Sequence, residues 1–178
     1  MADDEFWRTF AAKEQVALVA CRFTDKPHEQ GFIEEYVNVS KGSGQALLDA
    51  VSTFATQSKH PELATAPLLL WGMSAGGHTA LTLAGGRWSR ERLLAHCEAN
   101  LDEDWSACTG ARTEPGSGFW FGIQRAIARF LIRQNLGGDP RELGHVDPRI
   151  GAIVAGVPVA ADFDLATLVT PRVPLAVT

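Results

Sequence analysis

The 178-residue sequence contains no apolar run that approaches the roughly 18 residues of a membrane-spanning helix. It has 16 basic and 21 acidic residues, a net charge of −5, whereas proteins that bind nucleic acid need a basic surface. Its acidic start, MADDEFW, lacks the features of a signal peptide. These absences exclude a membrane span and a nucleic-acid partner, and they favour a cytoplasmic location.

Cysteine is scarce, and no nucleotide-binding motif is complete. Cys21, Cys97 and Cys108 have no metal-binding spacing and leave one thiol unpaired in any disulfide scheme. Cys97 and Cys108 flank a short loop where a bridge is conceivable, but three free thiols are expected in a cytosolic protein. No G-x-x-x-x-G-K-[ST] occurs, and the G-S-G at 42–44 lacks the third glycine of a dinucleotide fingerprint. We therefore predict no cofactor and no metal site.

The composition, with 46% hydrophobic and 21% charged residues, is that of an ordinary soluble protein of one domain, residues 1–178. Apolar periodicity predicts helices and strands in alternation, which is typical of an α/β fold with a mostly parallel sheet and flanking helices. Strands are expected at 16–21, 68–71, 150–157 and 173–178. Helices are expected at 4–14, from Ser43 to His60, after Ser74 as far as Gly86, and at 89–101 and 118–136.

The segment 86–147 is longer than one crossover between parallel strands requires, and we interpret it as a helical insertion. Its second helical pattern separates two kinds of residue. The apolar residues of one face are Trp120, Ile123, Ile127, Phe130 and Leu131. The arginines of another face are Arg125, Arg129 and Arg133. We expect these helices to cover the sheet, with the arginines in solvent. A lid over an apolar substrate and a helix lying on a membrane surface are the alternatives.

Residues 67–80, PLLLWGMSAGGHTA, carry the G-x-S-x-G pattern around Ser74. A short apolar run precedes it, as in a strand covered on both faces, and small residues of a helical stretch follow it. Gly72 and Gly76 would leave room for a strained strand-to-helix turn. Ser74 would then lie above the sheet edge at a helix N-terminus, which favours developing negative charge. The alternative is a tight turn with glycines chosen for packing, in which the serine is incidental.

Several segments together resemble the α/β-hydrolase superfamily, nearest to bacterial serine esterases related to dienelactone hydrolase and polyhydroxybutyrate depolymerase. They are VALVACRF, GSGQALLDA, HPELATAPLLLWGMSAGGHTAL, DPRIGAIVAGVP and PRVPLAVT. The resemblance implies a partial α/β-hydrolase core with a cap-like insertion at 86–147, and cleavage of carboxylic esters. In it Ser74 would be the nucleophile, and the backbone N–H of Ala75 would supply half of the oxyanion hole.

The sequence departs from the family where the other catalytic groups should lie. Such enzymes order their triad as Ser, Asp or Glu, then His, yet no histidine follows His145. Asp162 and Asp164, just beyond the 150–157 strand, are candidates for the acid, or they cap a helix near 165–168. His78 is expected to pack or to make a supporting contact. A serine without a base is a poor nucleophile, so a catalytically silent hydrolase-like module is the alternative function.

Compared with the family, the chain looks truncated at both ends. The central strand that should lie between the 16–21 strand and the strand leading into the elbow is not found, and unpaired backbone at a sheet edge is costly. The expected partners are a small-molecule ester and a second chain that completes the sheet in a homo-oligomer.

Overall fold

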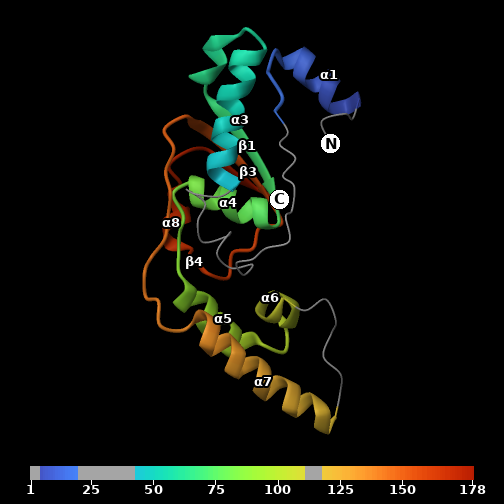
Figure 1. The fold of residues 1–178 in the computed structure, drawn as a ribbon, viewed down its shortest axis with the longest axis vertical. Helices are drawn as coiled ribbons and strands as arrows, with labels where there is room; N and C mark the ends of the chain where they lie inside the picture. Colours follow the sequence, from blue (N-terminus) through green and yellow to red (C-terminus); the bar gives the residue numbers. More distant parts are fainter. Residues whose placement is uncertain (1–4, 20–42, 111–117) are drawn as a thin grey trace. The chain divides into compact units, whose positions relative to one another are not determined.

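A computed structural model of the protein describes residues 5–19, 43–110 and 118–178 (Figure 1). Contacts between residues divide the chain into two compact units, Met1–Leu68 and Leu69–Thr178. Each unit is described by itself.

The first unit is helical in its described part. It contains α1 (Glu5–Glu14), α3 (Ser43–Gln57) and the short 3₁₀ helix η1 (Pro61–Ala64). Val51 and Ala55 on α3 are buried. After the helix, the backbone N–H of His60 donates to the Ala55 carbonyl at 3.1 Å, an ordinary hydrogen-bond distance. Proline suits the first position of a helix because its missing N–H would have no helical acceptor there. The helices predicted at 4–14 and from Ser43 are thus confirmed.

The strand predicted at 16–21 is wrong for its described part. Residues 16–19 belong to no strand, and Val16 and Leu18 are exposed. A strand requires a neighbour that accepts and donates its backbone hydrogen bonds, and an apolar run by itself does not supply one. The rest of this prediction and the polar stretch 22–42 lie outside the described residues.

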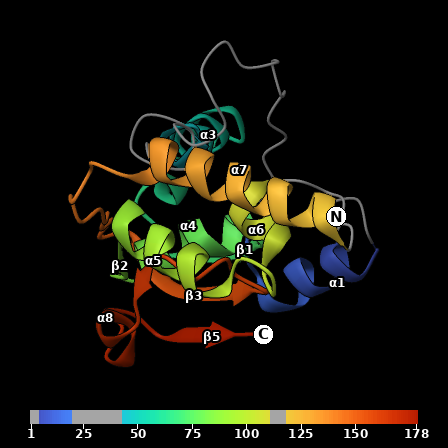
Figure 2. The same ribbon diagram turned by 90° about the horizontal axis from the view of Figure 1, so that it is seen from below.

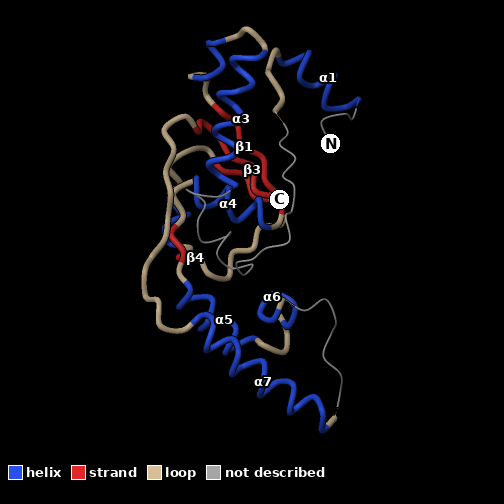
Figure 3. Tube along the Cα trace, viewed as in Figure 1, coloured by secondary structure: helices blue, strands red, loops and turns tan. Residues whose placement is uncertain are grey.

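The second unit contains a three-stranded parallel sheet in the order β1-β3-β5 (Figures 2 and 3). Strands β3 and β5 are in register from Ile153 opposite Leu175 to Ala155 opposite Val177. The coarse α/β class is therefore confirmed. The elements of this unit are β1 (Leu68–Met73), α4 (Ala75–Leu83), β2 (Arg87–Trp88), α5 (Arg90–Asn100), α6 (Trp105–Thr109), α7 (Phe119–Leu136), β3 (Ile150–Gly156), β4 (Phe163–Asp164), α8 (Ala166–Val169) and β5 (Leu175–Val177).

Only one face of β1 is covered by a helix of its own unit. Helix α4 packs on the sheet, and Gly72 of β1 faces the backbone of Gly76 in that helix. Because side chains alternate along a strand, the neighbouring positions point away from α4. Leu69 is 69% exposed and Met73 53% exposed. Within the described part of this unit, α4 covers one face of the strand, and the expected cover on the other face is not found there.

The insertion begins in a two-stranded ribbon, in which β2 pairs antiparallel with β4, and continues into three helices. Helix α7 packs on α5 and α6. Its arginines lie toward these helices, where Arg125 pairs with Asp102 and Arg133 with Glu98, whereas its apolar stripe is exposed. The predicted orientation of α7 is therefore wrong, because its buried residues are Ala128, Ile132 and Leu136 and not those of the apolar stripe. In the described ranges no helix has the length and apolar character to cross a membrane.

A disulfide joins Cys97, buried on α5, to Cys108 on α6. The expectation of three free thiols is wrong for this pair. The short loop between the two helices brings their Cα atoms to 5.5 Å, which is within the range that a disulfide spans. Cys21 lies outside the described residues.

Two Asp-Pro-Arg motifs make the same contacts in different surroundings. In each, the arginine backbone N–H and guanidinium donate to the aspartate two residues earlier. Asp147 is buried, accepts from Arg149 and begins the turn into β3, where its carbonyl accepts from Ile150 N at 3.3 Å. Arg149 lowers the pKa of Asp147 from 3.8, and Arg141 lowers that of Asp139 to about 2.

We predict that Asp147→Asn lowers the unfolding free energy by on the order of 1 kcal/mol at pH 7, because it weakens charged hydrogen bonds at a buried turn. The folded-state pKa of Asp147 is below its unfolded value. Its stabilisation is therefore present above about pH 4 and lost as the pH falls through the folded pKa. Urea unfolding between pH 7 and 2 should show a flatter acid decline for Asp147→Asn. The matched change Asp139→Asn, in the motif whose Arg141 is exposed, should lower stability at pH 7 less, because solvent screens that ion pair. Equal losses in both variants would contradict this assignment.

We predict that Cys97→Ser lowers the unfolding free energy by roughly 2–3 kcal/mol, because the bridge closes a short loop and limits the unfolded chain. Chemical denaturation with and without dithiothreitol measures the effect. Cys21→Ser is the control for loss of a thiol. A parent protein that is equally stable with and without the reductant would show that the bridge contributes nothing.

Candidate functional site

The chain turns sharply at Ser74, between the end of β1 and the start of α4. Ser74 has φ 55° and ψ −117°, and it is the residue that caps α4. A positive φ is uncommon for residues other than glycine and carries strain, which persists where the surroundings determine the conformation. This is the strained strand-to-helix corner that the G-x-S-x-G pattern predicts.

Hydrogen bonds hold this residue from both sides. The Ser74 N–H donates to the carbonyl of Gly156 at the end of β3, at 2.9 Å. The Ser74 carbonyl in turn accepts from His78 N at 3.0 Å, the first hydrogen bond of α4. The corner is therefore tied to the neighbouring strand and to the first helical turn.

Two of the glycines around the corner are needed for close approach, though not the pair that the sequence suggested. A Cβ on Gly72 would collide with the backbone carbonyl of Gly76. A Cβ on Gly77 would lie 2.9 Å from Cα of Pro158 and 3.0 Å from the Gly156 carbonyl oxygen. At Gly76 itself an added Cβ meets no atom within 4 Å. The steric requirement therefore falls on positions 72 and 77.

The Ser74 side chain is exposed, and no residue in the described ranges makes a hydrogen bond to its hydroxyl. Because the first helical hydrogen bond of α4 starts at His78 N, the N–H groups of residues 75–77 have no acceptor within the helix. A helix N-terminus with such N–H groups favours negative charge. The backbone N–H of Ala75 is thus placed beside the hydroxyl at the end of the helix that suits an oxyanion.

Apolar side chains surround this corner, because all three parallel strands end at the same edge. Met73, Val157 and Val177 are exposed there, and Val157 is 74% exposed. Val157 also has φ 39°, an outlier for a β-branched residue, while its N–H donates to the Thr178 carbonyl at 2.7 Å. Sequence reasoning did not find this second strained residue, whose only signal is its place between Gly156 and Pro158.

Asp162, the candidate acid, forms a buried pair with His78. Oδ2 of Asp162 lies 2.9 Å from Nε2 of His78, and both residues are buried. A carboxylate can only accept, so Nε2 donates. The imidazole packs against Trp88 and Phe163, with ring centroids at 4.8 and 4.7 Å. The supporting contact expected of His78 is thus made to Asp162, 84 residues away, a partner that no local pattern indicates.

The His78 ring is not placed to accept the Ser74 proton in this arrangement. Its second nitrogen, Nδ1, is buried and has no hydrogen-bond partner in the described part of the chain, as is also true of Asp162 Oδ1. Since Ser74 is exposed, the hydroxyl and this nitrogen lie in different environments. The pair links α4 to the segment after β3 and lies beneath the elbow.

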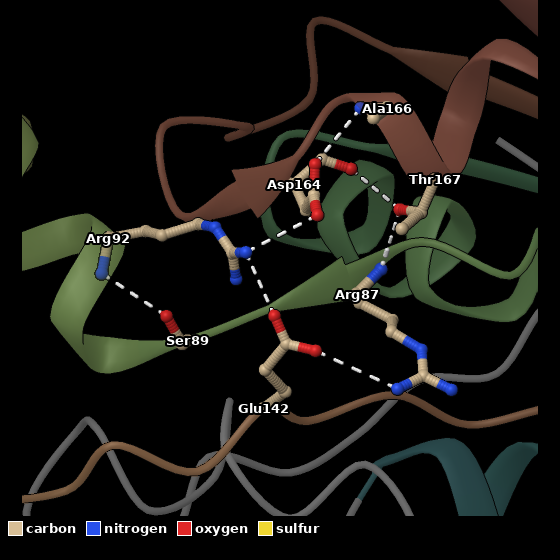
Figure 4. A network of polar contacts seen from close by, with 7 residues as sticks. All are labelled: Arg87, Ser89, Arg92, Glu142, Asp164, Ala166 and Thr167. Carbon is tan, nitrogen blue, oxygen red and sulfur yellow. Dashed lines mark hydrogen bonds and ion pairs between the residues drawn. The ribbon is translucent and has the colours of Figure 1, made fainter.

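Asp164 has a structural role, in a polar network that Figure 4 shows. Its carboxylate accepts from the backbone N–H of Ala166 at 3.1 Å and from Arg92 at 3.3 Å, and Arg92 also contacts Glu142 at 2.8 Å. The hydrogen bond to Ala166, two residues on, is an Asx turn just before α8, whose N-cap is Leu165; the expectation that Asp164 caps this helix is therefore met only by a contact next to the cap. Asp164 therefore fixes the start of α8 and the β2–β4 ribbon.

Two other described histidines have acidic partners. His60 contacts Glu62 within its own unit at 2.8 Å, and His96 contacts Asp104 at 2.9 Å on the α5–α6 side. For His145 no hydrogen bond to Ser74 is formed among the described residues. Within the described ranges, no group of three His, Cys, Asp or Glu residues has an arrangement that suits a metal ion. In the described ranges, the Ser74 hydroxyl therefore has no histidine side chain as a hydrogen-bond partner.

We predict that Gly72→Ala destabilises the protein by about 1–3 kcal/mol or prevents folding, because its Cβ would overlap the Gly76 backbone. Gly76→Ala, at the other glycine of the motif, should fold like the parent, since no atom lies within 4 Å of its Cβ. Thermal and urea unfolding compare the two variants. Equal stability of both would contradict the close approach of β1 and α4.

The comparisons with known proteins do not identify a family. No family model matches the sequence, and neither the curated proteins nor the solved structures provide a match.

Proposed function

We propose that the protein is a serine hydrolase of the α/β-hydrolase type that cleaves carboxylic esters. The observation that carries this proposal is the strained backbone of Ser74, which has an exposed hydroxyl at a strand-to-helix corner. Strained residues cluster at functional sites, where the surrounding structure maintains them. The resemblance of the sequence to dienelactone hydrolase-like and polyhydroxybutyrate depolymerase-like bacterial esterases points to the same chemistry.

In this proposal the Ser74 oxygen attacks the ester carbonyl and the carbonyl oxygen becomes negatively charged. The N–H of Ala75 and the N-terminus of α4 stabilise that charge, and one such donor contributes on the order of 3 kcal/mol. The bond from the carbonyl carbon to the alcohol oxygen breaks as the Ser74 ester forms, and the hydroxyl proton passes through solvent to the departing alcohol. Water then hydrolyses the Ser74 ester, which releases the acid and restores the hydroxyl. The exposed side chains of Met73, Val157 and Val177 suit an apolar acyl group at this edge.

A specific observation also favours a second candidate, a catalytically silent hydrolase-like module. Asp162, the acid candidate, already binds the His78 imidazole, and no histidine side chain in the described ranges makes a hydrogen bond to the Ser74 hydroxyl. A serine hydroxyl without a base reacts slowly because its proton has no acceptor. In that case the corner would persist as a structural feature.

The proposed partners are a small-molecule ester and a second chain that completes the sheet in a homo-oligomer. For the location, the cytoplasm expected from the sequence competes with an oxidising compartment. The Cys97–Cys108 bond favours the latter, because cytosolic thiols are kept reduced.

We predict that a fluorophosphonate probe labels the parent protein and not Ser74→Ala, and that p-nitrophenyl butyrate turnover falls by about a thousandfold or more in that variant. Thr56→Ala removes an exposed hydroxyl on α3 and serves as the matched control, with unchanged labelling and turnover. Equal turnover by the parent and Ser74→Ala would refute the nucleophile.

The same experiment separates the two candidate functions. Labelling of Ser74 together with turnover above buffer supports the esterase. A parent protein that shows neither, while circular dichroism confirms that it is folded, would overturn the esterase and favour the silent module.

A further inference from the structure

Helix α7 has two apolar faces, and only one is packed within its unit. Ala128, Ile132 and Leu136 are buried on the side toward α5 and α6. At 100° per residue, a second apolar set lies on the opposite side of the helix. We call it the α7 stripe; it consists of Phe119, Trp120, Ile123, Ile127, Phe130 and Leu131.

The α7 stripe is more exposed than a packed helix face would be. Phe119 is 81% exposed and Trp120 73%, and the four aliphatic and aromatic residues that follow are all exposed. Aromatic side chains each offer roughly 150–250 Å², so the stripe presents on the order of 700 Å² of apolar surface. The largest apolar patch on a typical monomer is roughly 300–600 Å². A patch of this size indicates a surface that another molecule covers.

Charge around the stripe argues against a membrane as that partner. Helices that lie on membranes place lysine and arginine on the polar face, where they meet anionic lipid headgroups. In α7 the side chains of Arg125 and Arg133 are bound to Asp102 and Glu98, each at 2.6 Å, and Arg129 is half-buried. Arg125 and Arg133 are therefore paired with acidic residues beside α5 and α6, while the α7 stripe itself carries no charge.

We propose that a second copy of this chain covers the α7 stripe, with the two α7 helices packed antiparallel about a two-fold axis. An uncharged stripe meets its own copy without repulsion between like charges. Two such stripes would bury roughly 1,400 Å², within the range of about 1,200–2,000 Å² that stable protein interfaces require. Ile127 lies at the middle of the helix, so it would lie near the axis, where both copies contribute the same residue.

This dimer does not depend on the esterase proposal, since the stripe contains no residue of the elbow. It also differs from a second chain that completes the sheet, because β1 and α7 are separate surfaces. A change at the stripe therefore tests the inference without changing the candidate active site.

Sedimentation equilibrium of the full chain measures the association. Protein concentrations from about 1 to about 200 μM bracket the dissociation constants of ordinary homodimers. The parent should dimerise, and Ile127→Asp should weaken dimerisation by about thirty-fold or more, since it places a charge at the centre of the apolar interface. Ala126→Asp adds the same charge at an exposed position beside the stripe, so its dimer should persist. Circular dichroism verifies that both variants retain their helices.

Three results would overturn the inference. The first is a parent that stays monomeric over the whole concentration range, and the second is equal association of Ile127→Asp and Ala126→Asp. The third is flotation of a monomeric parent with phosphatidylcholine–phosphatidylglycerol vesicles that Ile127→Asp abolishes, which would assign the stripe to lipid.

Discussion

The candidate site depends on a backbone contact that leaves no room for a side chain. Where β1 ends, Gly72 lies against the first turn of α4 so closely that a single methyl group would collide with the Gly76 carbonyl. The next residues must therefore reverse direction at once, and Ser74 takes a positive φ to do so. Its N–H is held by the Gly156 carbonyl, and Gly77 lets Pro158 approach the helix. Strain at one serine is thus maintained by contacts of its neighbours, and the hydroxyl is presented at the end of the helix that favours negative charge.

Local patterns predicted most helices of the fold, because amphipathic periodicity and helix ends are properties of neighbouring residues. α3 and α7 follow their apolar spacing, and Ser89 caps α5 as its position suggests. The wrong predictions concern which other segments a helix or strand contacts. Residues 16–19 are as apolar as a strand but have no strand partner, and the faces of α7 were assigned in reverse. From sequence alone, a row of arginines on a helix is expected to face solvent. The acidic residues that pair with it come from other segments of the chain and cannot be recognised from the helix itself.

The candidate site was predictable only where its residues are neighbours in sequence. The corner at Ser74 follows from spacing and glycine alone. The pairing of His78 with Asp162 joins α4 to the segment after β3, and neither residue signals the other. A carboxylate that the family likeness made an acid candidate instead satisfies a buried imidazole, which is costly to leave unpaired. The base of a hydrolase would have to approach Ser74 from its exposed side.

The most direct measurement is a crystal structure of the protein at a resolution that defines main-chain dihedral angles. The account predicts a positive φ near 55° at Ser74, with its hydroxyl exposed at the C-terminal edge of the sheet and its N–H bound to the Gly156 carbonyl. A Ser74 with ordinary helical dihedral angles, or one covered by other side chains, would contradict the account at its centre.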